Sequence, residues 1–393
     1  MEAIYFDNSA TTPLCPEARA AMLVAMDCYG NPSSLHTLGV EAEKIVSDSR
    51  RAILSALGVR CVTKIDERQL IFTGSGTEAD NLALTGTATA KNFPAGKKII
   101  VSNSEHAAIL ETVKALEARG FEIVRIATKN GIPDYEQIEA AADRNTILAS
   151  FMLVNNEIGA VYDIPRISRI VKAANPDALM HTDCVQGFLK RRFTVKSLGA
   201  DMVTISAHKI GGPKGMGALY ITPDVIKTKK LSPIIWGGGQ ESGRRSGTEN
   251  VIGIAGFGAA AKAGFARLSE TLERESAIRA HLIEALSDES RFAGVKLNLP
   301  AGEAAAHILN IRLPNIKSEV MLHDLSKAGI YVSSGSACSS NTGHGSYVLK
   351  AFGLTDKEAD CSIRVSLGAQ NTMEEADRFL DALENSLKTL VRI

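Results

Sequence analysis

A lysine suited to Schiff-base chemistry follows a predicted buried strand. The run 202–206 predicts the strand, and Ala207-His208-Lys209 comes directly after it. Ligands of open α/β sheets bind at the carboxyl ends of the strands, so Lys209 is predicted to face a ligand site. Burial and cationic neighbours would lower the pKa of Lys209 and make its neutral amine available as a nucleophile. An ordinary surface lysine is the alternative, because most lysines are exposed.

The segment from Thr73 to Thr77 has the features of a phosphate site. It includes Gly76, follows a predicted strand and precedes a predicted helix over 78–91. The N–H groups and the positive dipole end of a helix start, together with the Thr77 hydroxyl, suit a phosphate group. A simple helix cap is an equally good interpretation. Lys214, in a Gly-Pro-Lys-Gly turn, is a further candidate for a phosphate contact, although the chain has no Walker A pattern.

Polar side chains also follow three other predicted strands, and these are His106, Asn156 and the pair Asp183 and Gln186. A buried aspartate is costly without a positive partner, and a protonated pyridine nitrogen would be one; a helix cap is the alternative. The His106 ring could stack on a cofactor and exchange protons near neutral pH, although a lone histidine is more often structural. Together these strand ends suit one ligand with a phosphate, an aromatic ring and an aldehyde.

Short apolar runs alternate with helical patterns through the first two thirds of the chain, which is typical of an α/β domain with a mostly parallel sheet. The predicted strands are 69–72, 98–102, 122–126, 146–154, 178–182, 202–206 and 217–221. The predicted helices include 78–91, 107–119, 135–142 and 167–174. A long helical pattern over 251–287 is expected to lead to a smaller α+β domain. Its predicted elements are strands over 306–313, 329–332 and 362–366 and a closing helix over 373–390.

Composition limits the classes of protein and partner. The chain has 393 residues, 45% hydrophobic and 22% charged, which fits a globular protein of two or three domains. Its 44 basic residues balance 44 acidic ones, so no single-sign field would attract nucleic acid or an anionic membrane. The N-terminus lacks a signal-peptide pattern, and we expect no segment long and apolar enough to span a bilayer. A cytoplasmic protein without membrane or direct nucleic-acid partners is predicted.

Six cysteines are scattered along the chain without a CxxC pair or a metal-ligand spacing. This pattern disfavours both a disulfide framework and a structural zinc site, and we predict no metal site. Most of these cysteines are expected to be small buried side chains. Cys338 differs, because it lies in a Ser- and Gly-rich stretch over 333–346 that contains no apolar run. That stretch predicts a mobile loop.

Seven stretches resemble, in order along the chain, those of NifS/IscS-type cysteine desulfurases. They are Tyr5-Phe-Asp-Asn-Ser-Ala-Thr-Thr-Pro, Gly30-Asn-Pro-Ser-Ser-Leu-His, Thr73-Gly-Ser-Gly-Thr-Glu-Ala-Asp-Asn, Asn155-Asn-Glu-Ile-Gly, Ser206-Ala-His-Lys, Arg245-Ser-Gly-Thr-Glu-Asn and Ser334-Gly-Ser-Ala-Cys. The resemblance implies pyridoxal 5′-phosphate (PLP) as cofactor and the aspartate-aminotransferase fold, PLP fold type I. It also implies a large domain over 16–260, a small domain from 1–15 and 261–393, and a homodimer with active sites at the subunit interface.

The resemblance also implies roles for residues in matching motifs. Lys209 would bind the cofactor covalently and act with His106 in proton transfer, and Cys338 would accept the sulfur. Arg364, together with Asn156, would bind the carboxylate of the substrate L-cysteine. The cofactor contacts would be Gly76, Thr77, Ser206 and His208 at the phosphate, His106, Asn156, Asp183 and Gln186 around the ring, and Thr248 from the neighbouring subunit.

The implied reaction converts L-cysteine to L-alanine and leaves a persulfide on Cys338, whose thiolate attacks the substrate sulfur. The sulfur would pass to an acceptor protein, either an iron–sulfur scaffold or a tRNA-thiolation enzyme. After Cys338 the chain reads Ser-Ser-Asn-Thr-Gly-His-Gly, where many family members have a Leu-Glu-Pro-like stretch, so the acceptor stays open. Rival hypotheses are another fold-type-I enzyme, such as an aminotransferase or a selenocysteine lyase, and an inactive partner protein that retains the fold.

Overall fold

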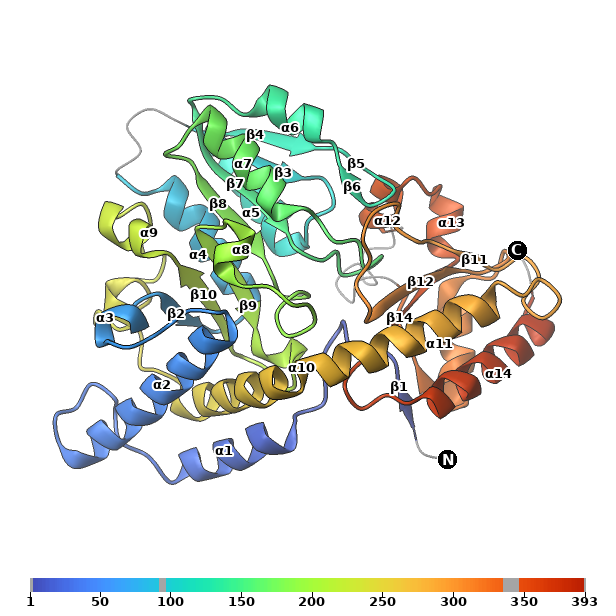
Figure 1. Cartoon of the computed structure of the whole chain (residues 1–393), viewed down its shortest axis with the longest axis horizontal. Coiled ribbons are helices and arrows are strands. Elements are labelled where there is room, and N and C mark those ends of the chain that lie inside the picture. Colours follow the sequence, from blue (N-terminus) through green and yellow to red (C-terminus); the bar gives the residue numbers. More distant parts are fainter. Residues whose placement is uncertain (1–2, 92–96, 335–345, 392–393) are drawn as a thin grey trace.

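The largest element of the computed structural model, which describes residues 3–91, 97–334 and 346–391, is a seven-stranded sheet (Figure 1). Its strands, in spatial order, are β2 (Leu70–Thr73), β10 (Gly217–Ile221), β9 (Met202–Ser206), β8 (Leu179–Asp183), β7 (Thr146–Met152), β3 (Lys98–Ser102) and β4 (Glu122–Ile126). β10 is antiparallel to both neighbours, and every other pair in this sheet is parallel. The mostly parallel sheet was predicted, and it gathers the carboxyl ends of β7, β8 and β9 at one edge.

Helices cover both faces of the sheet, because successive strand residues point to opposite sides. On one face, Ile71 and Ile99 belong to an apolar cluster with α4 (Gly76–Ala88), α5 (Ala107–Glu117) and α9 (Pro223–Thr228). On the other face, Phe72 and Ile100 belong to a larger cluster. The helices that cover this face within the cluster include α2 (Thr37–Ala56), α6 (Tyr135–Ala141), α7 (Ile164–Ala174), α8 (Val195–Leu198) and α10 (Val251–Leu286).

A second, smaller group of elements contains a three-stranded antiparallel sheet and its helices. The sheet consists of β11 (Lys296–Leu297), β12 (Ile308–Arg312) and β14 (Ser362–Ser366), and the helices are α11 (Ser318–Lys327) and α14 (Met373–Thr389). The N-terminal strand β1 (Ile4–Tyr5) pairs in parallel with β13 (Ile330–Tyr331). The Phe6 and Phe379 rings pack edge to face with centroids 5.8 Å apart. The start of the chain is thereby fixed against its last third.

The remaining elements are short, apart from the helix α1. They are α1 (Pro16–Met26), α3 (Lys64–Glu67), α12 (Tyr347–Phe352), α13 (Asp356–Asp360), β5 (Thr128–Lys129), β6 (Ile132–Pro133) and the 3₁₀ turns η1 (Ala207–Lys209) and η2 (Glu241–Gly243). α1 packs along α10 and lies beneath the large sheet in the view of Figure 1. Neither α1 nor α2 was assigned from the sequence.

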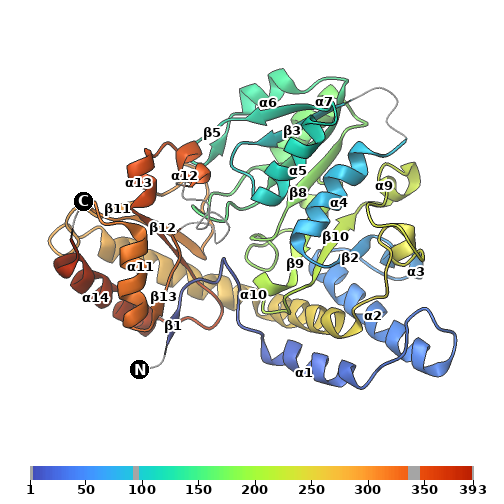
Figure 2. The same ribbon diagram turned by 180° about the vertical axis from the view of Figure 1, so that it is seen from behind.

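The long helix α10 extends from the large group of elements into the small one, as Figure 2 also shows. Its N-terminal half contacts α1 and α2, and its C-terminal half places Ile278 and Leu282 in the small apolar cluster. We expected no segment long and apolar enough to span a bilayer. That expectation is wrong, because α10 is long enough and apolar enough to do so by length and composition alone. Half of its apolar window is buried inside the protein.

The boundaries between the two predicted domains stay a prediction. The boundary proposed at residue 260 falls within α10, which continues through it as one helix. The small apolar cluster combines Ile4 and Phe6 with residues between 278 and 387, in line with a small domain built from both chain ends. Ile308 and Leu349, however, belong to the cluster of the large sheet. The two groups of elements therefore share apolar contacts near α12.

Candidate active site

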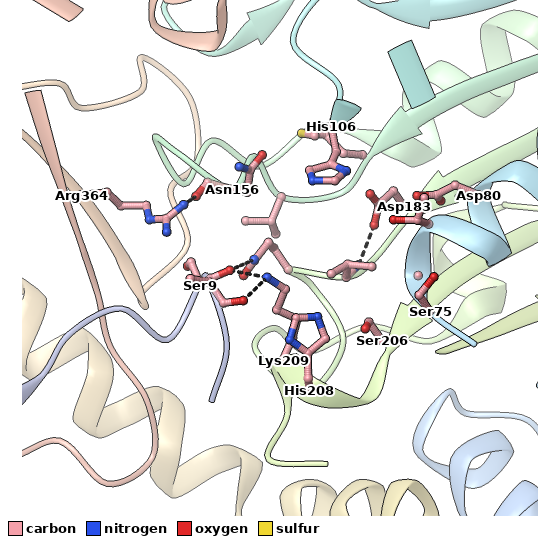
Figure 3. Close-up of a pocket in the computed structure, with 17 residues that line it drawn as sticks. Ser9, Ser75, Asp80, His106, Asn156, Asp183, Ser206, His208, Lys209 and Arg364 are labelled. Carbon is pink, nitrogen blue, oxygen red and sulfur yellow. Dashed lines mark hydrogen bonds between the residues drawn. The ribbon is translucent and has the colours of Figure 1, made fainter. Parts of the chain in front are cut away.

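A cavity of about 250 Å³ opens at the carboxyl edge of the large sheet (Figure 3). Its walls come from the ends of β7, β8 and β9, the starts of α4 and α5, the N-terminal segment and β14. The lining residues are Ser9, Ala10, Ser75, Gly76, Thr77, Asp80, His106, Met152, Val154, Asn156, Asp183, Val185, Gln186, Ser206, His208, Lys209 and Arg364. Every predicted cofactor and substrate residue within the described part of the chain lines this cavity, except Thr248 and the further phosphate candidate Lys214.

Lys209 lies just beyond the end of β9 and points its amine into the cavity (Figure 3). The Nζ atom donates hydrogen bonds to the carbonyl oxygens of Ser9, at 2.6 Å, and Ala10, at 2.7 Å. Burial, followed by the positive charges of Lys190 and Arg364, lowers the pKa of Lys209 to about 7. The predicted combination of burial and cationic neighbours is confirmed, and a substantial fraction of the amine is neutral at pH 7.

Two buried aspartates lie side by side at the inner end of the cavity (Figure 3). Asp183 ends β8, and its Oδ1 accepts a hydrogen bond from the Val185 N–H at 2.8 Å. Burial raises the pKa of Asp183 to about 6, against the effects of that hydrogen bond and of Lys209. Burial and then the Asp183 charge raise the pKa of Asp80 much further. Asp80 is therefore the protonated member of the pair, and Asp183 supplies the single negative charge.

The start of α4 forms the polar end of the cavity. Ser75 caps the helix by accepting a hydrogen bond from the Glu78 N–H, while the N–H groups of the first turn have no acceptor within the helix. Space here depends on glycine. A Cβ atom at Gly76 would lie 3.1 Å from the Val185 side chain, and one at Gly217 would lie 2.3 Å from the Ser75 carbonyl carbon. These glycines let β10 and the helix start approach closely, and the result suits an anionic group.

Arg364 forms the opposite side of the cavity, on β14 of the small sheet. It is 1% exposed, and its guanidinium donates to the Asn156 carbonyl oxygen and to Asp7 Oδ1, both at 2.9 Å. Its Nε has no partner among the described residues. The planar guanidinium is thus fixed at two nitrogen atoms, with a third donor available for a carboxylate.

His106 lies above the cavity as the N-cap of α5 (Figure 3). Its Nδ1 accepts a hydrogen bond from the Ala108 N–H at 3.1 Å, so the ring hydrogen is on Nε2. Burial, with a smaller effect from Lys209, lowers the pKa of His106 to about 4. The sequence suggested a histidine that titrates near neutral pH; in the structure the ring stays neutral there, because burial disfavours its charged form.

Two described candidates lie apart from this cavity. Thr248 is exposed on the segment before α10 and does not line the cavity of its own chain. Lys214 is exposed and does not line it either, which leaves Lys209 as the lysine in position to react. Cys338 lies outside the described residues, as does most of the predicted loop over 333–346.

Comparison with known proteins places this geometry in a family. Residues 4–379 match the family described as Aminotransferase class-V. The chain belongs to the class-V aminotransferase family. It is 39% identical over 389 residues to "Cysteine desulfurase IscS" of Dictyoglomus turgidum, covering 98% of this chain and 95% of that protein. It is 38% identical over 391 residues to a protein of the same name from Methanosarcina thermophila, covering 99% and 93% of the two chains.

Solved structures of this class-V family agree with the sequence relatives. A "NifS-like protein" superposes with a TM-score of 0.89 at 35% identity, covering 99% of this chain and all of that one. A NifS-like protein from Rickettsia africae superposes with a TM-score of 0.85 at 31% identity, again covering 99% of this chain and all of that one. The predicted fold, PLP fold type I, and the resemblance to NifS/IscS-type cysteine desulfurases are confirmed.

The residues of this class-V family member fit PLP. Asn156 Oδ1, Gln186 Oε1 and Arg364 Nε are buried polar atoms with no partner among the described residues. Such atoms cost free energy unless a ligand or water satisfies them. The start of α4 suits the phosphate, Asp183 a protonated ring nitrogen, and Lys209 the aldehyde. One ligand with these three groups would satisfy the cavity as a whole.

Sequence reasoning missed three contributors to the cavity of this family member. Ser9 and Ala10 hold the Lys209 amine through their carbonyl oxygens, which any residue type provides, so no side-chain signal could have revealed them. Asp80 was part of a quoted motif, but no role was assigned to it. Its position four residues after Gly76 on α4 places it one helical turn further in, and that spacing was a usable signal.

Proposed function

We propose that this chain is a PLP-dependent cysteine desulfurase that converts L-cysteine to L-alanine and transfers the sulfur to its own Cys338. The carrying observation is a single cavity in which Lys209, Asp183 and Arg364 converge, in a chain related to cysteine desulfurases over nearly its full length. PLP, when bound, supplies an electron sink for the electron pair released at the substrate Cα.

The chain's own residues orient the substrate. Arg364 would bind the cysteine carboxylate through its free Nε and an adjacent nitrogen, while the Asn156 carbonyl oxygen and Asp7 keep the guanidinium plane fixed. Asp183 would hold the ring nitrogen of the cofactor as an ion pair. Protonated Asp80 leaves one net negative charge at that end of the cavity, which matches one positive nitrogen.

Lys209 would transfer the proton at the substrate Cα, and His106 would assist it. Because the pKa of Lys209 is about 7, its amine gains and loses a proton easily at neutral pH. It would remove the proton from the substrate Cα and later return one to carbon. His106, neutral with hydrogen on Nε2, would donate a hydrogen bond and fix the ring plane without adding a charge.

Sulfur transfer requires a thiolate. The Cys338 thiolate would attack the substrate sulfur, so that a sulfur–sulfur bond forms as the bond between Cβ and sulfur breaks. The electron pair of the broken bond stays with carbon. Cβ then takes up a proton to become the methyl group of alanine, and the sulfur remains on Cys338 as a persulfide.

A stoichiometric assay tests the proposal directly. The purified chain with PLP and L-cysteine, without reductant, should form one alanine for each sulfur gained by the protein, as measured by amino-acid analysis and intact-protein mass spectrometry. Added dithiothreitol should then allow continuous sulfide release. Transfer of the amino group to a keto acid with no alanine formed would instead establish an aminotransferase.

The exposed apolar residues around α1 support a homodimer. Tyr29 and Leu35, in the segment between α1 and α2, are 81% and 97% exposed, and Leu23 and Val24 on α1 are also exposed. Apolar surface of this kind is typical of a protein interface. Thr248 is exposed just before α10, the helix that packs against α1 and α2, and does not line the cavity of its own chain. We infer that it completes the cofactor site of the neighbouring subunit.

Disrupting the exposed apolar surface around α1 should therefore both separate the subunits and reduce the activity. Light scattering should give a mass twice the 41.8 kDa of one chain for the wild type. Leu35→Glu should give monomers with at least about tenfold lower activity, because a charge buried in an apolar interface is costly. Val320→Glu, at an exposed apolar position on α11, is the matched control and should stay dimeric and active. An active monomer would contradict the shared site.

The sulfur acceptor and location are proposed from chemistry. An iron–sulfur scaffold or a tRNA-thiolation enzyme would take the persulfide sulfur from Cys338. Transfer of this kind requires a reducing compartment, and the described cysteines, Cys15, Cys28, Cys61, Cys184 and Cys361, are free thiols. We therefore propose a cytoplasmic location.

A further inference from the structure

A second cavity, of about 140 Å³, lies behind Lys209. Lys209 lines both this rear cavity and the cofactor cavity. The polar residues around the rear cavity include Thr12, Lys190, Arg267, Glu275 and Gln370. The volume and the polar lining allow it to hold several water molecules. Lys190 in this space acts on Lys209 in addition to the charges of the cofactor cavity.

Lys190 is the buried cation of the rear cavity. It is 7% exposed, and its Nζ has no hydrogen-bond partner among the described residues. It follows Leu189, whose backbone φ of +56° lies in the left-handed region that residues with side chains seldom adopt. Packing against α10 near Gly264 holds Leu189 there. The chain therefore keeps an unfavourable turn, and with it the lysine side chain in the cavity.

Glu275 is the matching buried anion, on the wall formed by α10. It is 3% exposed, and its Oε2 has no hydrogen-bond partner among the described residues. No direct ion pair joins Glu275 to Lys190 within the described part, although both line the same cavity. Water between them would satisfy both groups, since a polar cavity of this size admits it. Two opposite charges near each other compensate part of the cost of burying each.

The other charges near Lys190 are mostly positive, although Asp7 and Asp183 act on Lys209 in the opposite direction. Arg364 and Lys209 lie toward the cofactor cavity, while Arg279 and Arg274 project from α10 near Glu275. Buried His307 on the segment before β12 has both ring nitrogens unpaired among the described residues, and burial and the Lys190 charge lower its pKa well below the usual value. His307 is therefore neutral. Arg267 is engaged with Glu17, which leaves Glu275 as the anion that compensates Lys190.

We propose that Lys190 is a positioning residue for the desulfurase reaction: its ammonium group, kept charged by Glu275 across the rear cavity, favours the neutral amine of Lys209. This inference rests on the proposed role of Lys209. A like charge close to an amine in a desolvated site disfavours protonation of that amine. Burial raises the pKa of Glu275 to about 7 and lowers that of Lys190 to about 8. The charged forms of both side chains are therefore only slightly favoured near neutral pH. Loss of either partner would therefore neutralise the other.

Competitive acetylation measures the charge state of Lys209 without turnover. The full-length chain, freed of cofactor with hydroxylamine, would be treated with acetic anhydride between pH 5 and 10, and acetylation of Lys209 followed by peptide mass spectrometry. The wild type should show a midpoint near pH 7, because burial and cationic neighbours lower the pKa of Lys209 to about 7. In Lys190→Met the midpoint should rise by about one pH unit, and the acetylation rate at pH 7 should fall about fivefold.

Three further variants separate charge from packing. Lys190→Arg keeps the charge and should retain the wild-type midpoint. Glu275→Gln should raise the midpoint as Lys190→Met does, because Lys190 then loses its proton, and the double variant should show no additional rise. Lys230→Met removes another buried lysine, which does not line the rear cavity and whose Nζ lies 2.8 Å from oxygen atoms of Asp177. This variant should leave the Lys209 midpoint unchanged.

An unchanged Lys209 midpoint in Lys190→Met would overturn the proposal, and so would an equal shift in Lys230→Met. If Lys190→Met does not fold, Glu275→Gln provides the test. An unchanged Lys209 midpoint in that variant would show that the Lys190 and Glu275 pair does not affect Lys209. The measurement does not depend on cysteine turnover. Failure of the desulfurase proposal would appear instead as absent alanine formation, with the acetylation midpoints unaffected.

Discussion

Replacing Cys338 with alanine should abolish persulfide formation and reduce alanine production from cysteine by at least about a thousandfold. The substrate sulfur then has no nucleophile to receive it. Lys209, Asp183 and Arg364 are held by contacts with other, described residues, so cofactor and cysteine binding should persist. The wild type and the variant would be exposed briefly to cysteine without reductant and compared by intact mass spectrometry and by amino-acid analysis.

Four of the other cysteines provide controls, because the structure disfavours their thiolate forms. Burial raises the pKa of the Cys15, Cys61, Cys184 and Cys361 thiols. A thiol that stays protonated is a poor nucleophile, so Cys61→Ala should retain wild-type persulfide formation. Gain of one sulfur by the Cys338→Ala variant, with alanine formed at a near-normal rate, would show that another group is the acceptor.

The strands of the large sheet were predictable because their apolar runs are short and end abruptly. The predicted bounds 98–102, 122–126, 202–206 and 217–221 coincide with β3, β4, β9 and β10. β3, β9 and β10 are buried along their whole length and are mostly apolar, whereas the edge strand β4 keeps polar residues on its exposed side. The helix α2 escaped assignment because polar residues interrupt its buried stripe, as Ser47 and Ser49 do.

The candidate site was predictable where chemistry follows a strand and unpredictable where it depends on distant segments. His106, Asn156, Asp183 and Lys209 each come after a buried strand, and parallel pairing brings these ends together. The rear cavity could not be predicted. Lys190 is an ordinary lysine in the sequence until its turn and α10 enclose it, because burial and neighbouring charge arise only in the folded chain.

Replacing Lys209 with alanine should lower alanine production by roughly 10⁴-fold, since one amine both binds the cofactor and transfers the proton. Lys209→Arg should be as inactive, although it keeps a long cationic side chain, because a guanidinium does not lose its proton at accessible pH. Lys214→Ala is the matched control: Lys214 is exposed five residues later, lies outside the cavity and should be dispensable. Circular dichroism would verify that each variant is folded.

The pH dependence provides the second part of this test. The pKa of Lys209 is lowered to about 7, so the neutral, reactive amine is lost as the pH falls below 7 and predominates as it rises above. The rate at which the cofactor-free chain binds added PLP should therefore increase with pH through about 7. Borohydride reduction of the loaded protein and peptide mapping should place the retained cofactor mass on Lys209. A label on Lys214, or a binding rate that rises only near pH 10 as for an exposed lysine, would show that burial has not prepared Lys209 for this role.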